Sequence, residues 1–277
     1  MDIKYVSGTG AVTIDFTEYP YIMRTGGTLI DYGWSFESTD NYQKPGGRIT
    51  RFTRSITTRS IPIDVRAASE AIYIAAVNYL HNIFERDVVN LTPGKLYFND
   101  YYLTCYVTSS TKGEWEGPAD YQQNNLTITI AYPLWVKETT NSFVGSAGSG
   151  GLAYPYDYPY DYVNSYATDN LTNDHFASSD CEIIIYGACA DPSIIIGGNT
   201  YAVTAELSAL EYLAINTRDK TIYKYSSTGA QTNLFNSRNR SSYCFNQVPA
   251  GANLVSWDGS FAFRVTLFAE RSEPEWT

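Results

Sequence analysis

Alternating apolar and polar residues run along much of the chain and predict many short β-strands. Near the N-terminus, Val12, Ile14 and Phe16 alternate with polar neighbours, which is typical of a strand that is buried on one face. Residues 29–36 predict a further strand, and residues 40–47 predict a turn-rich loop. A long β-prone run then extends to residue 65, so the first part of the chain is expected to be rich in strands.

One segment, residues 64–86, has the period of an amphipathic helix instead. Its apolar residues recur at steps of three or four, and they are Ala68, Ile72, Ala75, Tyr79 and Ile83, with Ala76, Leu80 and Phe84 beside them. Asp64 is the expected N-cap, and the residues after position 86 return to β-branched character. We predict one helix of about 20 residues whose broad apolar face is covered by the rest of its domain.

Strand signals resume after the helix and lead to a predicted domain boundary. Residues 95–98 and 101–108 predict a hairpin around the turn Asn99-Asp100. Residues 126–131 alternate and run into Tyr132-Pro133-Leu134-Trp135, where we place the boundary. The predicted domains are therefore residues 1–135 and residues 136–277.

The second half of the chain predicts a β-sandwich. Short strand-like runs separated by turns occupy residues 182–186, 193–196, 201–204, 212–215, 221–225, 254–257 and 261–267. Leu207, Leu210 and Leu213 also fit a helical step, but the stretch is short and is bracketed by strands, so we predict strands there. Residues 145–162 differ from the rest, because a Gly/Ser-rich stretch precedes a repeated Tyr-Pro-Tyr-Asp motif.

Composition narrows the classes of protein that the chain can represent. A length of 277 residues suits two ordinary domains, and the hydrophobic content of 44% is enough for buried cores. The formal net charge of -10 argues against nucleic-acid specificity, and no apolar run is long enough for membrane insertion. The first residues lack the apolar core of a secretion signal, so we expect folding in a cytoplasm. The 25 tyrosines fit a plain β-rich fold or an assembly protein.

Residues that usually carry catalysis or metal binding are few and scattered. Cys105, Cys181, Cys189 and Cys244 have no zinc-site spacing, so we expect free and mostly buried thiols. The two histidines, His81 and His175, have no partner at a catalytic or metal-binding spacing and are expected to be structural. We expect no catalytic residue, metal or cofactor.

Two carbohydrate-related alternatives are weaker. Glu114 and Glu116 flank Trp115 in a Gly-bounded loop, but catalytic carboxylates usually come from separate elements, so a solvated loop is the better interpretation. Trp257 is a candidate for stacking on a sugar ring, although a Trp before a hairpin turn is more often a core residue. Tyr156, Tyr158 and Tyr160 are candidate partner or glycan contacts that could equally cover a sheet edge of their own domain.

A basic stripe stands out in this acidic chain. It consists of Lys44, Arg48, Arg51, Arg54, Arg59 and Arg66. One interpretation is a solvated strand face. The other is a subunit interface, where arginine is favoured, and for it we take Arg48, Arg51, Arg54 and Arg59 as the candidate residues.

The order of several short motifs resembles that of the distal tail protein family of long, flexible-tailed bacteriophages. The motifs are Ile184-Ile185-Tyr186-Gly187, Asp191-Pro192-Ser193-Ile194-Ile195-Ile196-Gly197-Gly198-Asn199-Thr200-Tyr201, Ile215-Asn216-Thr217, Val248-Pro249-Ala250-Gly251-Ala252-Asn253, Trp257 and Arg271-Ser272-Glu273-Pro274-Glu275-Trp276. The first-domain strands, single helix, hairpin and Tyr132-Pro133-Leu134-Trp135 fit the same family. Residues 145–162 do not match its pattern.

The resemblance implies a mainly β fold with one α-helix. Residues 1–135 would form a split-barrel, β-barrel-like domain that closes into a hexameric ring, and residues 136–277 a galectin-like β-sandwich that projects outward. The implied role is a structural hub of the phage tail tip, or baseplate. Its implied partners are the tail tube protein, the tail tip protein and a receptor-binding protein, in a virion assembled in the host cytoplasm. The alternative is a carbohydrate- or receptor-binding sandwich that contacts the host surface.

Overall fold

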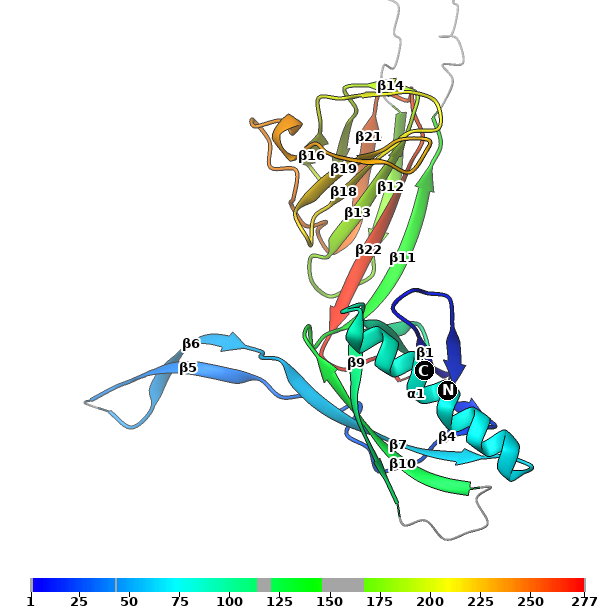
Figure 1. Cartoon of the computed structure of the whole chain (residues 1–277). Helices are drawn as coiled ribbons and strands as arrows, with labels where there is room; N and C mark the ends of the chain where they lie inside the picture. The colour runs from blue at the N-terminus through cyan, green and yellow to red at the C-terminus, as the bar shows by residue number, and fades with distance from the viewer. Residues whose placement is uncertain (1, 43, 114–120, 146–166, 277) are drawn as a thin grey trace, which may run out of the picture. The chain divides into compact units, whose positions relative to one another are not determined.

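The computed structural model describes residues 2–42, 44–113, 121–145 and 167–276 (Figure 1). Contacts divide the chain into two compact units, Met1–Lys137 with Glu270–Thr277, and Glu138–Ala269. Apart from one short 3-10 turn, every regular element in the described ranges is a β-strand except one α-helix, which confirms the predicted mainly β fold. The Glu114 and Glu116 loop and the candidate contacts Tyr156, Tyr158 and Tyr160 lie outside the described residues.

The first unit consists of antiparallel strands around β9. Its strands are β1 (Ile3–Val6), β2 (Thr13–Asp15), β3 (Thr17–Glu18), β4 (Tyr21–Met23), β5 (Ser35–Asp40), β6 (Gly47–Thr53), β7 (Thr57–Arg66), β8 (Gly94–Phe98), β9 (Tyr101–Lys112), β10 (Tyr121–Ile130) and the start of β11 (Trp135–Phe143). One series of pairs runs β9-β10-β7-β4-β3, and the other runs β9-β8-β1-β2. The strands β5 and β6 pair only with each other among the described residues.

Two predicted boundaries in this unit are wrong. Residues 29–34 form no strand, and β5 begins at Ser35, passes the predicted strand end at residue 36 and ends at Asp40, the first residue of the predicted loop. The helix α1 is Glu70–Val89, with the predicted length of 20 residues but a later start. Asp64 is not its N-cap, because it lies in β7, where Arg24 Nε approaches its carboxylate at 2.7 Å. Ser69 caps α1 instead, and its side chain accepts a hydrogen bond from the Ile72 amide.

The buried stripe of α1 is rotated from the predicted one. Ile72 and Tyr79 are exposed, whereas the residues facing the core are Tyr73, Ala76, Leu80, Ile83, Phe84 and Asp87. This stripe packs against β9 and β7. Asp87 is fully buried and accepts hydrogen bonds from Tyr5 Oη at 2.8 Å and from the Gly8 amide at 3.1 Å, so it joins the end of α1 to β1.

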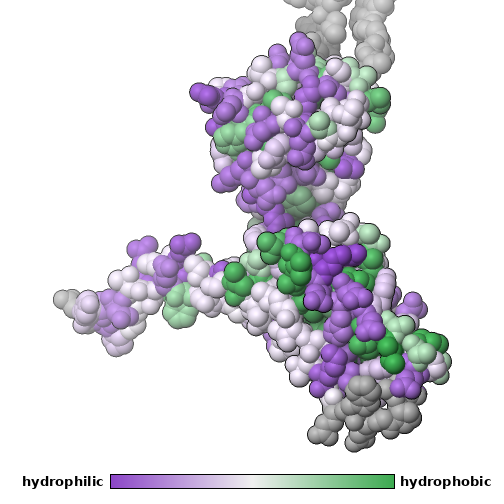
Figure 2. Space-filling model, in the orientation of Figure 1, coloured by the Kyte–Doolittle hydropathy of each residue, from purple (hydrophilic) through white to green (hydrophobic). Residues whose placement is uncertain are grey.

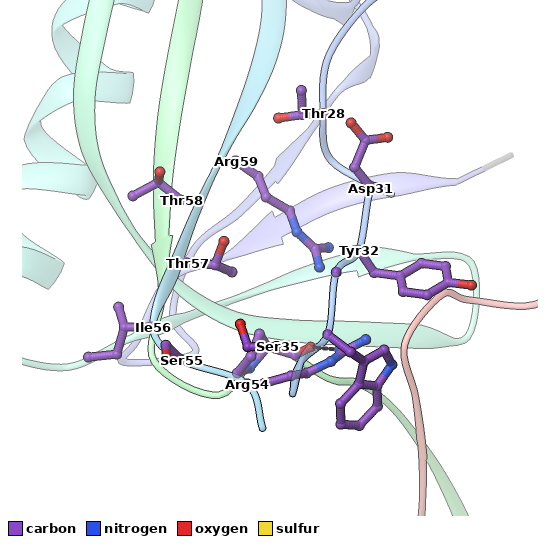
Figure 3. A pocket seen from close by; sticks show the side chains of 13 residues that line it. Thr28, Asp31, Tyr32, Ser35, Arg54, Ser55, Ile56, Thr57, Thr58 and Arg59 are labelled. Atoms are coloured by element: carbon purple, nitrogen blue, oxygen red, sulfur yellow. Dashed lines mark hydrogen bonds between the residues drawn. The ribbon is translucent and has the colours of Figure 1, made fainter. Parts of the chain in front are cut away.

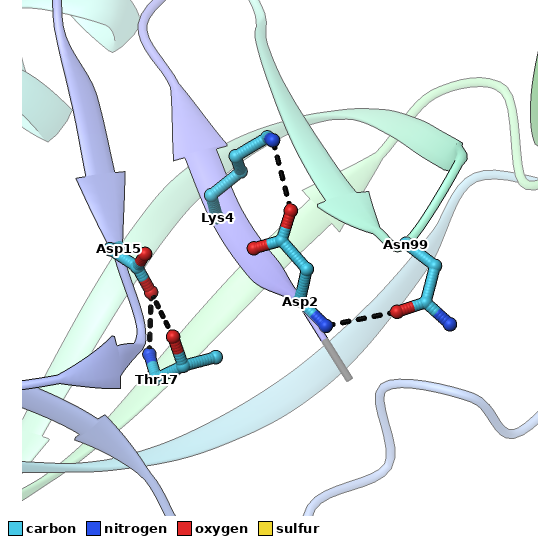
Figure 4. Close-up of polar contacts among 5 residues, drawn as sticks. All are labelled: Asp2, Lys4, Asp15, Thr17 and Asn99. Carbon is cyan, nitrogen blue, oxygen red and sulfur yellow. Dashed lines mark hydrogen bonds and ion pairs between the residues drawn. The ribbon is translucent and has the colours of Figure 1, made fainter.

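The hairpin β8–β9 confirms the predicted turn and anchors the N-terminal strand. Asn99 has a φ of 51°, the left-handed conformation that a two-residue hairpin turn requires and that Asn tolerates. Its side-chain oxygen accepts a hydrogen bond from the Asp2 amide at 2.9 Å, and its own amide donates to Asp2 O at 2.8 Å (Figure 4). Lys4 pairs with the Asp2 carboxylate beside this contact. The turn therefore holds the start of the chain.

The second unit is a sandwich of antiparallel sheets. Its strands are β12 (Ala167–Asn173), β13 (Asp180–Tyr186), β14 (Cys189–Ala190), β15 (Ser193–Ile196), β16 (Asn199–Ala202), β17 (Glu206–Leu207), β18 (Tyr212–Asn216), β19 (Thr221–Tyr225), β20 (Gln231–Asn233), β21 (Gly251–Trp257) and most of β22 (Phe263–Arg271). Most of β11, from residue 138 on, also belongs to this unit. One sheet has the order β20-β19-β18-β13-β22-β11, a second has the order β12-β21-β15-β16, and β14 pairs with β17. The region around Leu207 and Leu213 is strand, as predicted, and Leu210 is exposed between them.

Apolar residues from both sheets form the core of this unit. Trp257 lies in it, packed edge-on to Phe143 and Phe263, and its indole N–H donates to Phe261 O at 3.1 Å.

All four cysteines are free thiols and three are buried, as predicted. Burial raises the pKa of Cys105 and Cys181 to about 12, so these thiols are unreactive near neutral pH.

The last eight residues return to the first unit and do not stay with residues 136–269. Trp276 packs edge-on to Phe98, with ring centroids 5.7 Å apart. Glu275 accepts a hydrogen bond from Tyr101 Oη and pairs with Arg271. These contacts explain why a polar C-terminal segment is held against a hairpin that precedes it by about 175 positions in the sequence.

Candidate functional site

The strands β5 and β6 form an arm that leaves the body of the first unit (Figure 1). Every residue of β5 is exposed, and in β6 only Thr53 is partly covered. An isolated two-stranded hairpin is marginally stable in water, because it has no second layer against which to bury a face. The arm is therefore an element whose side chains are available to a partner.

The arm has one charged and one apolar face, and its register explains why. Glu37 lies opposite Arg51 and Thr39 opposite Arg48, with a bulge in between that places one extra residue, Thr50, in β6. Because the bulge shifts the alternation by one position, Arg48 and Arg51 lie on the same face although they are three residues apart. The opposite face carries the pairs Phe36 with Phe52 and Ser38 with Ile49, followed by Asp40 with Gly47 at the tip end of the arm.

The apolar face of the arm is open to solvent. Phe36 is 59% exposed and Phe52 is 57% exposed, and Ile49 is exposed beside them. Trp34 continues this face, since its ring lies edge-on to Phe52 at a centroid distance of 6.4 Å. Hydrophobic and hydrophilic side chains both line the arm in Figure 2. A contiguous exposed patch of large apolar residues on a soluble protein marks an interaction surface.

A polar pocket lies at the base of the arm (Figure 3). Arg54 and Arg59 both line it, and hydroxyl side chains of Thr28, Ser35, Ser55, Thr57 and Thr58 surround them. The Arg54 guanidinium lies over the Trp34 ring at 4.2 Å and donates to Pro133 O and to Ser272 Oγ. Arg59 is buried, and its Nη1 donates to Leu29 O at 2.6 Å. The pocket therefore contains two guanidinium groups that are partly shielded from water.

Burial lowers the pKa of both arginines from the ordinary value. For Arg59 the nearby charge of Arg54 lowers the pKa further, and Asp31 partly offsets these effects. Both side chains remain charged at any physiological pH, since an arginine titrates far above it.

The structure separates the four candidate interface arginines. Arg48 and Arg51 are exposed on the arm, whereas Arg54 is partly buried and Arg59 buried at its base. They do not form one solvated strand face. Their assignment to a subunit interface stays a prediction. Arg48 and Arg51 would contribute to it from the exposed arm, and Arg54 and Arg59 from the pocket at the base of the arm.

The other sequence candidates are not brought together. Trp257 is 4% exposed, so its ring offers no face to a glycan. His81 and His175 lie in different units. Within the described ranges, no group of three or more His, Cys, Asp or Glu side chains is placed to hold a metal ion. The one α-helix found there is too polar to cross a membrane.

Sequence reasoning missed the apolar face of the arm. Trp34 and Phe36 flank Ser35 at the start of β5, and Ile49 and Phe52 lie in β6, so the apolar signal was present in the sequence. The pattern of a half-buried strand does not say whether the covering layer belongs to the same chain. The bulge that brings Arg48 and Arg51 to one face has no signal in the sequence.

No protein-family model matches the sequence, and neither does any curated protein. Solved structures do match over almost their whole length. SPP1 Dit (gp 19.1), described as a paradigm of the hub adsorption apparatus in phages that infect Gram-positive bacteria, gives a TM-score of 0.62 with 97% of this chain and 98% of that chain covered. The fold is that of Dit.

Two baseplate structures of phage p2 agree with this Dit-like fold. A chain of the activated baseplate with Sr gives a TM-score of 0.63, and one with Ca gives 0.59, each covering 99% of both chains. The sequence identities are 11% to SPP1 Dit and 14% and 16% to the p2 chains. At this level of identity the likeness establishes the Dit-like fold, and the role of the chain has to be argued from its own surface.

Proposed function

We propose that this protein is a structural hub of a phage tail tip or baseplate. The observation that carries the proposal is the match to SPP1 Dit and to p2 baseplate chains over 97–99% of this chain, which includes both compact units. A shared arrangement of two different units is more specific than a match to one common β-fold. The role is non-catalytic and belongs to the virion tail, with assembly in the host cytoplasm.

In this proposal the first unit, residues 1–137 with 270–277, forms a hexameric ring, and residues 138–269 form the outer sandwich. A ring needs a head-to-tail interface, in which one face of a subunit meets a different face of the next. The arm supplies one such face, because its apolar side has no covering layer among the described residues. A durable contact would bury about 1,600 Å² of surface. An extended arm can contribute to this area because both of its faces are open to a neighbouring subunit.

The ring would join the tail tube protein to the tail tip protein, and the outer domain would hold a receptor-binding protein. The main candidate for glycan binding, Trp257, is buried in the core and cannot stack on a sugar ring. We therefore favour protein partners for the outer domain over sugars.

Sedimentation velocity of the full chain tests the ring. We expect a species of six times the 31.0 kDa chain mass, alone or after the tail tube protein is added. Reversing the charge of Arg48 and Arg51 together should weaken it, since both are exposed on one face of the arm. The matched control reverses Arg66, an exposed arginine at the end of β7. A chain that stays monomeric with the tube protein present would refute the hub.

A further inference from the structure

Arg59 is a buried cation with little to balance it. Its side chain projects from β7 into the pocket, and the residue is 5% exposed (Figure 3). A guanidinium carries five N–H donors, yet within the described parts of the chain its only hydrogen-bond acceptor is Leu29 O. A carbonyl oxygen satisfies one donor and does not neutralise the charge. Burying a charge without a counter-charge is costly.

The pocket adds a second cation beside Arg59, and its lining carboxylate, Asp31, offsets the two positive charges only in part. Arg54 lines the same wall, and neither arginine forms an ion pair with any described residue. Asp31 also lines the pocket, but its carboxylate points away from the Arg59 guanidinium in Figure 3. The remaining lining side chains include several hydroxyls, which can donate hydrogen bonds to an anion. Asp31 is therefore the one carboxylate among the lining residues, and it forms an ion pair with neither arginine.

We propose that the pocket between Arg54 and Arg59 binds a carboxylate side chain supplied by a second copy of this chain. This inference rests on the proposed function, because it needs copies that meet side by side. The planar donors of two guanidinium groups match the two oxygens of a carboxylate. A chain with 29 Asp and Glu against 19 Lys and Arg has an excess of such groups to offer.

The position of the pocket favours a second copy over another partner. Trp34 forms part of the pocket wall, stacks on Arg54 and contacts Phe52 edge-on. Pocket and apolar arm face are thus one continuous surface. A copy that covers the arm would also close the mouth of the pocket, and excluding water there would strengthen the ion pair.

The test compares Arg59→Met with Arg66→Met, which removes an exposed charge from the same strand. We expect Arg59→Met to weaken self-association by roughly tenfold or more, because the partner carboxylate is left unpaired. The melting temperature of the dilute chain should not fall, since an unbalanced charge is removed. Arg66→Met should change neither quantity. A purely structural Arg59 would instead lower the melting temperature and leave association unchanged.

Acetate, as a small carboxylate, probes the pocket without a second copy. At fixed ionic strength, replacing chloride by acetate should raise the melting temperature of the dilute wild-type chain and have no effect on Arg59→Met. Equal responses of both proteins would overturn the carboxylate site. A ring that forms equally well with Arg59→Met would overturn this inference and keep the hub. A chain that responds to acetate but never self-associates would overturn the second copy as the source, together with the hub.

Discussion

Two hairpins of the first unit follow the same local rules and end in opposite environments. In β8–β9, alternate side chains such as Leu96, Phe98 and Leu103 are buried in the core. In β5–β6, an aromatic pair of similar kind, Phe36 with Phe52, faces solvent. Both hairpins pair antiparallel and both join aromatic side chains across strands. The difference is the layer behind them, which the described part of the chain provides for β8–β9 and not for β5–β6.

The two hairpins are expected to contribute to different properties, β8–β9 to the stability of the single chain and β5–β6 to its assembly. Residues of β8–β9 contribute to the free energy of unfolding of the single chain, because their burial is intramolecular. Residues of the arm contribute nothing comparable until something covers them. Substitutions of the same residue type in the two hairpins should therefore change different measured quantities, and the following tests rank them from the largest expected effect to the smallest.

The largest effect is expected for Phe98→Ala. This side chain is 1% exposed and packs on Trp135 and Trp276, so its removal leaves a cavity. We expect a loss of about 3–5 kcal/mol in the free energy of unfolding, measured by urea denaturation at a dilute chain concentration. The matched variant Phe36→Ala on the arm should change it by less than about 0.5 kcal/mol. Equal losses in both variants would remove the distinction between the hairpins.

The second test measures how the aromatic pair of the arm affects self-association. Replacing Phe36 and Phe52 together by Ser removes the aromatic pair from the arm without touching the core. We expect self-association to weaken by about 100-fold, near 3 kcal/mol, because apolar anchors carry most of the energy of an interface. Sedimentation equilibrium measures the constant. An unchanged constant would mean that the arm does not contact a second copy.

The third test concerns the contact between α1 and β1. Tyr5→Phe removes the hydroxyl that donates to the buried Asp87 carboxylate, and burial together with this bond raises the pKa of Tyr5. We expect a loss of about 1–3 kcal/mol in the free energy of unfolding, because a buried carboxylate oxygen loses one of its two donors and keeps only the Gly8 amide. Self-association, corrected for folding, should not change. A selective loss of association would show that this buried contact also shapes the interface.

The smallest effect is expected at the exposed turn between β2 and β3. Asp15 accepts hydrogen bonds from the Thr17 hydroxyl and amide, and these lower the pKa of its carboxyl (Figure 4). A lowered pKa in the folded state stabilises the protein above the unfolded pKa, and the stabilisation is lost as pH falls through the folded pKa. Thr17→Val should move the Asp15 pKa up toward its ordinary value in a carboxyl NMR titration. A pKa that does not rise would assign the effect to the amide alone.

Much of the fold could be predicted from the sequence, because alternation reports local burial. The β8–β9 hairpin, the sandwich strands and the length of α1 follow from it. The start of α1 could not be predicted, since Asp64 caps helices well but here pairs with Arg24, which directly follows β4. The face of α1 is off by one residue at Ile72 and Tyr79, because both alternative stripes are apolar.

The candidate site was only partly predictable. The sequence shows the arginines as a run of positive charge. It does not show that a bulge places Arg48 and Arg51 on one face or that Arg59 is buried. Both facts depend on register and tertiary packing, which a one-dimensional pattern does not contain. Trp257 shows the converse, because an aromatic residue before a turn gives no sign of which way its ring points.

The return of residues 270–277 to the first unit makes the second unit an insertion with two covalent tethers, at Lys137–Glu138 and at Ala269–Glu270. A pulling force on the inserted part is shared by two peptide strands, so a single proteolytic cut in either crossing would not release it. The same arrangement means that shortening the chain from its C-terminal end first removes Trp276 from Phe98 and damages the first unit before the second.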